Sequence, residues 1–271
     1  MKNILLIIIT ILMFSCTKED ATNNDVTDVA VVQSYIEPNN PIRVKLTKML
    51  PFVEGGNTGV QTIDDAQVFI EHNGTSFLLS PIANKHGQYE CLDNNLQIIA
   101  SETYKLSFDY NDYTVMAITS IPTKPENTSL STSVYYIDPN ATGPGSSAPD
   151  PMLVNWSNPD NEYHLVVVEY LESTYSPINA NLDPALYDQF RKVSTDPIND
   201  NSTNLTTRQH LLFFGNYRIL IYKINEEYVN LYENISQSTL NMTEPTTNIE
   251  NGVGIFSGMN SDTLFLKVKS L

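Results

Sequence analysis

Basic residues and cysteines are scarce in this sequence, and each shortage excludes a class of protein. Lys and Arg together number 15 against 31 Asp and Glu, which gives a formal net charge of −16. Because nucleic-acid binding depends on clustered basic residues that replace phosphate counterions, we expect no nucleic-acid partner. Only two cysteines, Cys16 and Cys91, occur in 271 residues, so a disulfide framework is excluded.

Residues with catalytic or metal-binding chemistry are present but form no recognisable pattern. No two of the histidines lie at metal-ligand spacing, and no Gly-x-Ser-x-Gly segment occurs. The histidines are His72, His86, His164 and His210. Asp160, Asp196 and Asp200 in polar segments leave weak Ca²⁺ binding open, although their spacing does not match an EF-hand. The sequence therefore predicts a protein that is not an enzyme, without catalytic residues, metal or cofactor.

The first 15 residues have the parts of a secretory signal peptide. Lys2 supplies a positive charge, residues 4–14 are apolar apart from Thr10, and the small residue Ser15 ends the segment. The apolar run is too short to cross a bilayer, which needs about 20 residues. We predict that residues 1–15 are a signal peptide.

The end of this segment resembles a lipobox, in which a signal peptidase cuts before a cysteine that carries diacylglycerol. The residues are Met13-Phe14-Ser15-Cys16, and Met13 departs from the usual Leu. The resemblance implies that Cys16 is the lipidated first residue of a lipoprotein. Its acyl chains would bury methylenes in outer-membrane lipid, at about 0.8 kcal/mol each. An ordinary signal peptide followed by a chance cysteine is the alternative.

A short charged segment follows the predicted lipidation site. Lys18, Glu19 and Asp20 resemble the surface-export signal of Bacteroidota lipoproteins, which implies a place on the cell surface, in the outer leaflet of the outer membrane. The alternative is a solvated tether on a protein held in the periplasmic leaflet. Residues 16–27 are mostly polar and contain no aromatic residue, so we predict a flexible lipidated tether.

Residues 28–122 show the pattern of a β-sandwich. Short runs with alternating apolar and polar positions indicate strands with one wet face, and turn-rich segments separate them. The Asn73-Gly74 pair between two apolar runs predicts a hairpin, because both central residues of a type I′ turn need positive φ. Roughly seven such runs predict an immunoglobulin-like or prealbumin-like fold.

Residues 128–271 form a second predicted β-sandwich domain. A strand with Trp156, a polar turn and two strands that start with Tyr resemble a fibronectin type III sandwich, with Trp156 in the core. Two short helices interrupt the strands, one near residues 183–191, where an Asp-Pro pair suits a helix start, and one near residues 226–237, where apolar residues recur at helical spacing. The polar residues 194–210 predict a long mobile loop.

Several of these segments follow the order found in one known family. The chain resembles the uncharacterised Bacteroidota outer-membrane lipoproteins known as a domain of unknown function, whose C-terminal signature is similar to Asn-Ile-x-x-Gly-x-Gly-x-Phe. The matching residues are Asn248, Ile249, Gly252, Gly254 and Phe256. The resemblance implies an N-terminal β-sandwich and genes often found beside TonB-dependent receptors. It implies no catalytic residue.

The signature also has a physical interpretation. Gly252 and Gly254 alternate with apolar residues, and glycine in a strand marks a bulge or the close approach of another backbone. A phosphate cradle does not fit, because no Lys follows at the required place. We therefore predict that the signature is structural.

The predicted outer-membrane location and the family resemblance together suggest two functions. The first is a non-enzymatic accessory lipoprotein that partners a TonB-dependent β-barrel receptor in nutrient capture or uptake. The alternative is a free-standing surface module or adhesin that binds glycan or protein. The sequence identifies neither a ligand nor the partner.

Overall fold

The computed structural model describes residues 28–49, 59–138, 149–236 and 246–271. The first eight strands are β1 (Ala30–Ile36), β2 (Arg43–Lys48), β3 (Phe69–His72), β4 (Thr75–Leu78), β5 (Ser80–Pro81), β6 (Gln88–Glu90), β7 (Thr103–Tyr110) and β8 (Tyr113–Ser120). The later elements are β9 (Glu126–Leu130), β10 (Val134–Ile137), β11 (Met152–Ser157), β12 (His164–Tyr170), η2 (Pro184–Phe190), β13 (Lys192–Ser194), β14 (Ser202–Leu205), β15 (Gly215–Ile224), α2 (Glu226–Ser236), β16 (Ile249–Glu250) and β17 (Val253–Ser270). The chain is mainly β, as predicted.

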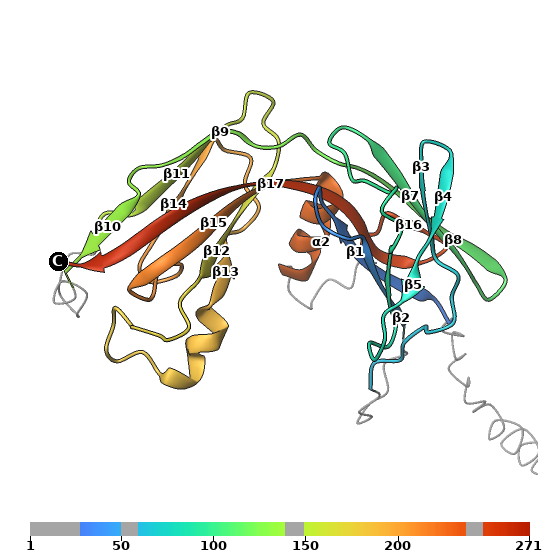
Figure 1. Cartoon of the computed structure of the whole chain (residues 1–271), viewed down its shortest axis with the longest axis horizontal. Coiled ribbons are helices and arrows are strands. Elements are labelled where there is room, and N and C mark those ends of the chain that lie inside the picture. The colour runs from blue at the N-terminus through green and yellow to red at the C-terminus, as the bar shows by residue number, and fades with distance from the viewer. Residues whose placement is uncertain (1–27, 50–58, 139–148, 237–245) are drawn as a thin grey trace, which may run out of the picture.

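The N-terminal sandwich contains β1 to β8, β16 and the first part of β17 (Figure 1). One layer is part of a nine-stranded sheet, in the order β17-β1-β2-β6-β5, and the other is a five-stranded sheet in the order β16-β8-β7-β3-β4. Alternate side chains of β1 and β7, such as Val32, Tyr104 and Leu106, are buried between the layers. Strands β1 and β7 therefore each have one buried face, as the alternating sequence predicts.

Asparagine turns close the two main hairpins of this sandwich. Asn73 and Gly74 have φ values of 49° and 76° between β3 and β4. Asn111, with a φ of 53°, begins the turn between β7 and β8. Glycine and asparagine adopt this left-handed backbone at little cost, and the predicted Asn73-Gly74 hairpin is confirmed.

The C-terminal sandwich contains β9 to β15 and the last part of β17 (Figure 1). Its layers are the β13-β12-β15-β17 part of the large sheet, with β10 on the end of β17, and a three-stranded sheet in the order β14-β11-β9. Trp156 is only 4% exposed and lies in a core that includes Phe213 and Tyr217. The prediction that Trp156 is a core residue is confirmed.

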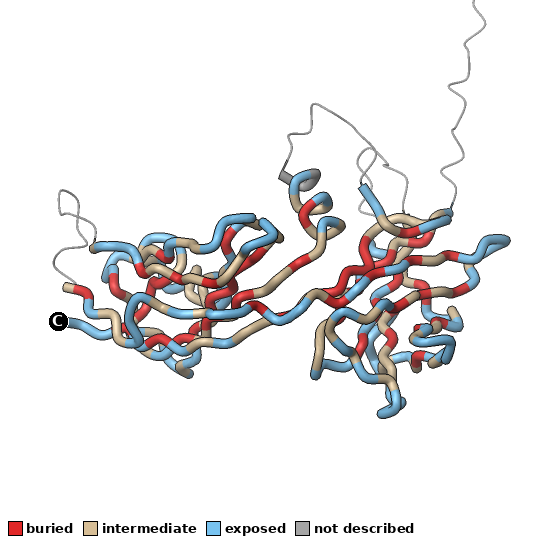
Figure 2. Tube along the Cα trace, turned by 90° about the horizontal axis from the view of Figure 1, so that it is seen from above, coloured by how far each residue is buried: buried red, intermediate tan, exposed pale blue. Residues whose placement is uncertain are grey.

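Strand β17 belongs to both sandwiches, and Figure 1 shows it crossing from one to the other. Its first part pairs in parallel with β1, and its later part pairs antiparallel with β15. Phe256 lies in the N-terminal core, whereas Leu266 lies in the C-terminal core. Residues 249–258, predicted as part of the second domain, therefore complete the first sandwich instead. Figure 2 shows buried residues on both sides of this crossing.

The predicted helices are present, but the predicted loop is not as expected. The 3₁₀ helix η2 follows Asp183, whose carboxylate accepts a hydrogen bond from the Ala185 amide at 2.9 Å. Helix α2 matches the prediction near residues 226–237. The prediction of a long loop over residues 194–210 is wrong, because β14 lies within it and pairs with β11. This strand is at a sheet edge, where its polar residues remain partly exposed.

Helix α2 lies beside the β17 crossing (Figure 1), and its Val229 packs in one cluster with Leu165 and Val167 of β12 in the C-terminal sandwich. Asn225, which precedes the helix, donates to the Ser120 carbonyl of β8 at 2.8 Å. The Tyr228 ring meets the Tyr35 ring of β1 edge-on, with centroids 5.7 Å apart. Side-chain contacts thus reinforce the shared strand at the junction.

Candidate functional site

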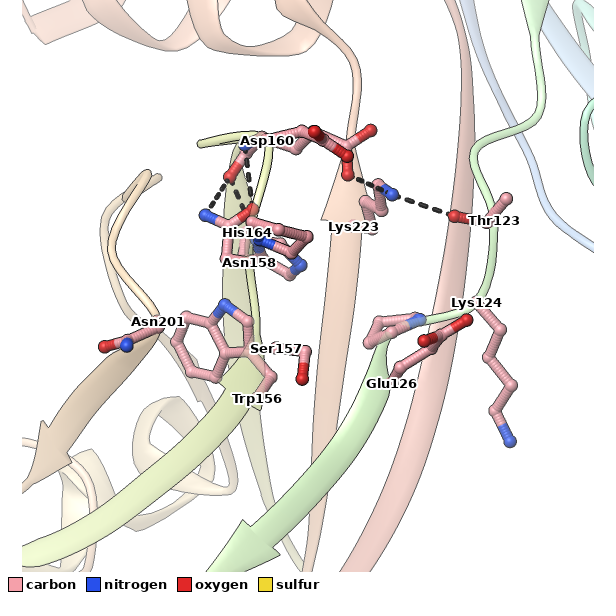
Figure 3. A pocket seen from close by; sticks show the side chains of 13 residues that line it. Thr123, Lys124, Glu126, Trp156, Ser157, Asn158, Asp160, His164, Asn201 and Lys223 are labelled. Carbon is pink, nitrogen blue, oxygen red and sulfur yellow. Dashed lines mark hydrogen bonds and ion pairs between the residues drawn. The ribbon is translucent and has the colours of Figure 1, made fainter.

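A pocket of about 570 Å³ lies where the linker between the two sandwiches passes the end of the C-terminal sandwich. The linker of residues 121–125 forms one wall. The turn between β11 and β12, and the paired strands β12 and β15, form the other. Figure 3 shows His164 and Asn158 on one side of the pocket and Thr123 and Lys124 on the other. Most side chains in this lining are polar, the exceptions being Pro125, Trp156 and Pro159.

Lys223 is a largely buried cation in this pocket. Its side chain is 12% exposed, and it lies opposite His164 in the register of β12 and β15. The ammonium donates to the Thr123 hydroxyl oxygen at 2.8 Å and pairs with the Glu162 carboxylate. Because an ammonium has three N–H donors, one donor remains for the pocket.

His164 supplies the matching acceptor. The residue is 1% exposed, and its Nδ1 lies 3.0 Å from the Glu162 carbonyl oxygen. A carbonyl only accepts, so Nδ1 must carry the proton. Burial lowers the pKa of His164, and the nearby Lys223 charge also favours the neutral ring. Among the described residues nothing donates to Nε2, which Figure 3 shows on the pocket side of the ring.

Side-chain hydrogen bonds hold both walls in place. The Asn158 amide donates to the Glu162 carbonyl and accepts from the Glu162 N–H, each at 2.9 Å. Across the pocket, the Asn260 amide donates to the Pro122 carbonyl of the linker at 3.0 Å. The pocket is thus formed before any ligand arrives, as is usual for small-molecule sites.

The rim of the pocket carries unpaired negative charge. Glu126 and Asp160 are exposed, and neither forms an ion pair with a residue in the described ranges. Lys124 pairs with Asp262 at 2.6 Å, and Figure 3 shows its side chain directed away from His164. The nearby cations are therefore already neutralised by protein carboxylates.

The predicted lipidation and export residues, Cys16, Lys18, Glu19 and Asp20, lie outside the described residues. None of the helices that the structure describes has the length and apolar character needed to cross a membrane.

The C-terminal signature lies in the N-terminal sandwich, away from the pocket lining. The Asn248 amide donates to the Phe256 carbonyl at 2.6 Å and accepts from the Phe256 N–H at 3.1 Å. Gly254 has a φ of 111°, and a Cβ there would lie 2.0 Å from the Val32 carbonyl oxygen. A Cβ at Gly252 would lie 2.9 Å from Ile249. The close backbone approach that the alternating glycines predict is present.

Neither a metal site nor a nucleophile paired with a base is assembled in the described parts of the chain. No group of three or more His, Cys, Asp or Glu side chains suited to a metal occurs there. Asp196, a residue left open for Ca²⁺, accepts a hydrogen bond from the Tyr232 hydroxyl. Likewise, no described Ser, Thr or Cys side chain donates to Nε2 of His164, so no nucleophile is paired with that base.

Sequence reasoning missed how these residues come together. It treated His164 only as a histidine without metal-ligand spacing, and it gave no role to Lys223 or Thr123. Thr123 and Lys223 are 100 positions apart and meet only because the linker folds back over β15. The polar turn of residues 157–162 was the one local signal.

The fold and pocket define a mainly β protein of two sandwiches that share one strand. The chain belongs to the family described as domain of unknown function (DUF4249), which matches residues 18–264. No curated protein matches the chain.

Among solved structures, the chain resembles the FN1–FN3 domains of chicken CNTN1. The identity is 12%, the TM-score is 0.28, and the match covers 89% of this chain and 64% of that one. This chain thus spans less than two thirds of that structure. At this level the likeness carries no argument about function.

Proposed function

We propose that this protein is a lipid-anchored outer-membrane lipoprotein that binds a ligand and serves a TonB-dependent β-barrel receptor in nutrient capture or uptake. It acts without catalysing a reaction. The observation that carries this proposal is the preformed pocket between the linker and the C-terminal sandwich, hereafter the junction pocket. In it, His164 offers an acceptor and Lys223 offers a donor that no described residue uses.

The chemistry of the pocket favours binding over catalysis. A hydrolase of the serine or cysteine type needs a nucleophile within hydrogen-bond reach of its base. Ser157 lines the pocket, but among the described residues no Ser, Thr or Cys side chain, Ser157 included, donates a hydrogen bond to Nε2 of His164. The neutral His164 ring is therefore placed to accept a hydrogen bond from a ligand rather than to activate a protein hydroxyl.

The expected anchor supports a role beside a membrane receptor. Fourteen positions separate Cys16 from Ala30, where the first strand begins. A fully extended chain covers at most about 3.5 Å per residue, so the start of β1 would stay within about 50 Å of the bilayer. A tether of that reach would keep the N-terminal sandwich near a barrel in the same membrane.

Co-purification tests this proposal. The tagged protein is crosslinked in cells, extracted from outer membranes in detergent and analysed by mass spectrometry. We expect a TonB-dependent barrel to be enriched, and the enrichment to fall in a Cys16→Ala variant that lacks the anchor. Repeated absence of any barrel from the anchored protein would reject the proposal.

An exposed apolar end supports the alternative of a free-standing adhesin. Phe265 and Leu171 are 64% and 43% exposed and line a second hollow of about 470 Å³ in the C-terminal sandwich. Exposed apolar side chains beside a hollow offer contact area to a glycan or protein partner. The adhesin hypothesis expects a Phe265→Ser variant to lose binding to glycan or protein in the absence of a barrel.

A further inference from the structure

The donor and the acceptor in the junction pocket select one kind of ligand group. Lys223 offers an N–H donor and His164 offers an Nε2 acceptor, and the two lie opposite each other on paired strands. A carboxylate or phosphate oxygen only accepts, so it leaves Nε2 without a donor. An ammonium only donates, so it leaves the Lys223 donor unused. A hydroxyl both donates and accepts, and therefore satisfies both groups.

Two hydroxyls on the walls extend this pattern. The Ser157 oxygen accepts from the Asn127 amide, and the Thr123 oxygen accepts from Lys223. Each hydroxyl keeps its own proton as a donor for the pocket. Several donors and acceptors spread over one surface suit a ligand with several hydroxyls better than a ligand with one.

Charge disfavours an acidic ligand. The Glu162 carboxylate already pairs with Lys223, while Glu126 and Asp160 on the pocket wall have no cationic partner among the described residues. An anion that enters would meet these two carboxylates without gaining a free cation. Like charges brought together in this way reduce affinity and oppose the wrong ligand.

The junction pocket has the size of a small-molecule site. Its volume of about 570 Å³ lies within the range of roughly 300–1,000 Å³ typical of small-molecule sites. The Trp156 ring, stacked at a tilt near His164 with centroids 5.1 Å apart, gives the lining an apolar part for carbon-bound hydrogens. We propose that the junction pocket binds a neutral mono- or disaccharide, an inference that deepens the proposed ligand-binding function and rests on it.

Titration with matched sugars tests this inference. The anchored protein is purified whole in a detergent without a sugar headgroup. Isothermal titration and saturation-transfer NMR then measure glucose, galactose, mannose, N-acetylglucosamine, maltose and cellobiose, with glucuronate as an anionic analogue of glucose. We expect saturable binding of at least one neutral sugar, and binding of glucuronate at least tenfold weaker than that of the tightest neutral sugar, because Glu126 and Asp160 oppose an anion.

Variants locate the binding in the pocket. Ser157→Ala and His164→Asn should each weaken the bound sugar by about tenfold, the factor for losing about 1.4 kcal/mol. Asn at position 164 keeps the donor to the Glu162 carbonyl but lacks an acceptor at the Nε2 position, and His164→Gln should restore part of the affinity. Ser129→Ala, on exposed β9, is the matched control and should bind as the unaltered protein does.

Two results would overturn the inference. One is the absence of saturable binding by every neutral sugar in the panel. The other is equal affinity in Ser157→Ala, His164→Asn and the Ser129→Ala control. Co-purification with a barrel is measured on the same variants, so loss of the sugar site is distinguished from failure of the receptor association.

Discussion

Replacing Gly254 with alanine tests whether the β1–β17 contact holds the molecule together. Gly254 has a φ of 111°, a conformation that costs a residue with a side chain about 1–3 kcal/mol. An added Cβ would also lie 2.0 Å from the carbonyl oxygen of Val32, which belongs to the backbone and cannot rotate away. Overpacking of this kind costs about 1–3 kcal/mol more.

Together these effects lower the free energy of unfolding by about 4 kcal/mol. A chain of this size loses roughly 2–4 °C of Tm for each kcal/mol lost from its free energy of unfolding, so we expect the Tm of Gly254→Ala to be lower by about 8–16 °C. Circular dichroism and scanning calorimetry on the purified protein measure this shift directly.

Gly59→Ala is the matched control. No heavy atom lies within 4 Å of the position that a Cβ would take there, so the control should change stability by less than about 0.5 kcal/mol. A Tm of Gly254→Ala within about 2 °C of the Tm of Gly59→Ala would correspond to a loss of less than about 1 kcal/mol in the free energy of unfolding. That result would mean that the β17 backbone can move away from β1, and it would refute the reasoning.

Three further predictions concern the shared strand and the pocket. Asn248→Ala removes both hydrogen bonds to the Phe256 backbone and should destabilise the protein by about 1–3 kcal/mol in urea titration; an unchanged midpoint would contradict this. Calorimetry should show one transition, because β17 completes both sandwiches, and two well-separated peaks would contradict that coupling. Burial lowers the pKa of His164 in the folded protein below its usual 6.5. At pH values between the pKa of the folded state and that of the unfolded state, the unfolded chain therefore binds more protons than the folded one. Stability should therefore fall as pH drops below about 6.5, and less so in His164→Gln; equal slopes would contradict this assignment.

Local patterns predicted the parts of the fold that depend on neighbouring residues. The Asn73-Gly74 turn, the alternating strands and the helix that begins at Glu226 depend on backbone preference and periodicity, and all are present. Edge strand β14 escaped prediction because its polar residues stay partly exposed, so its sequence lacks the apolar alternation of an inner strand.

Contacts distant in sequence could not be predicted in the same way. Nothing near Phe256 indicates that β17 leaves one sandwich and enters the other, because apolar residues recur along its length. The pocket depends on the same kind of contact, since Thr123 meets Lys223 only after both sandwiches are in place. The lipidation and export predictions at Cys16 and Lys18 remain predictions.

The position of β17 in the chain also sets the order of events during biosynthesis. This strand is synthesised long after β1, yet the two strands pair, with Val31 beside Val253. A nascent chain therefore cannot close either core before β17 has been made, and pairings this distant form slowly. A truncation that removes β17 would therefore leave both sandwiches without the strand that they share.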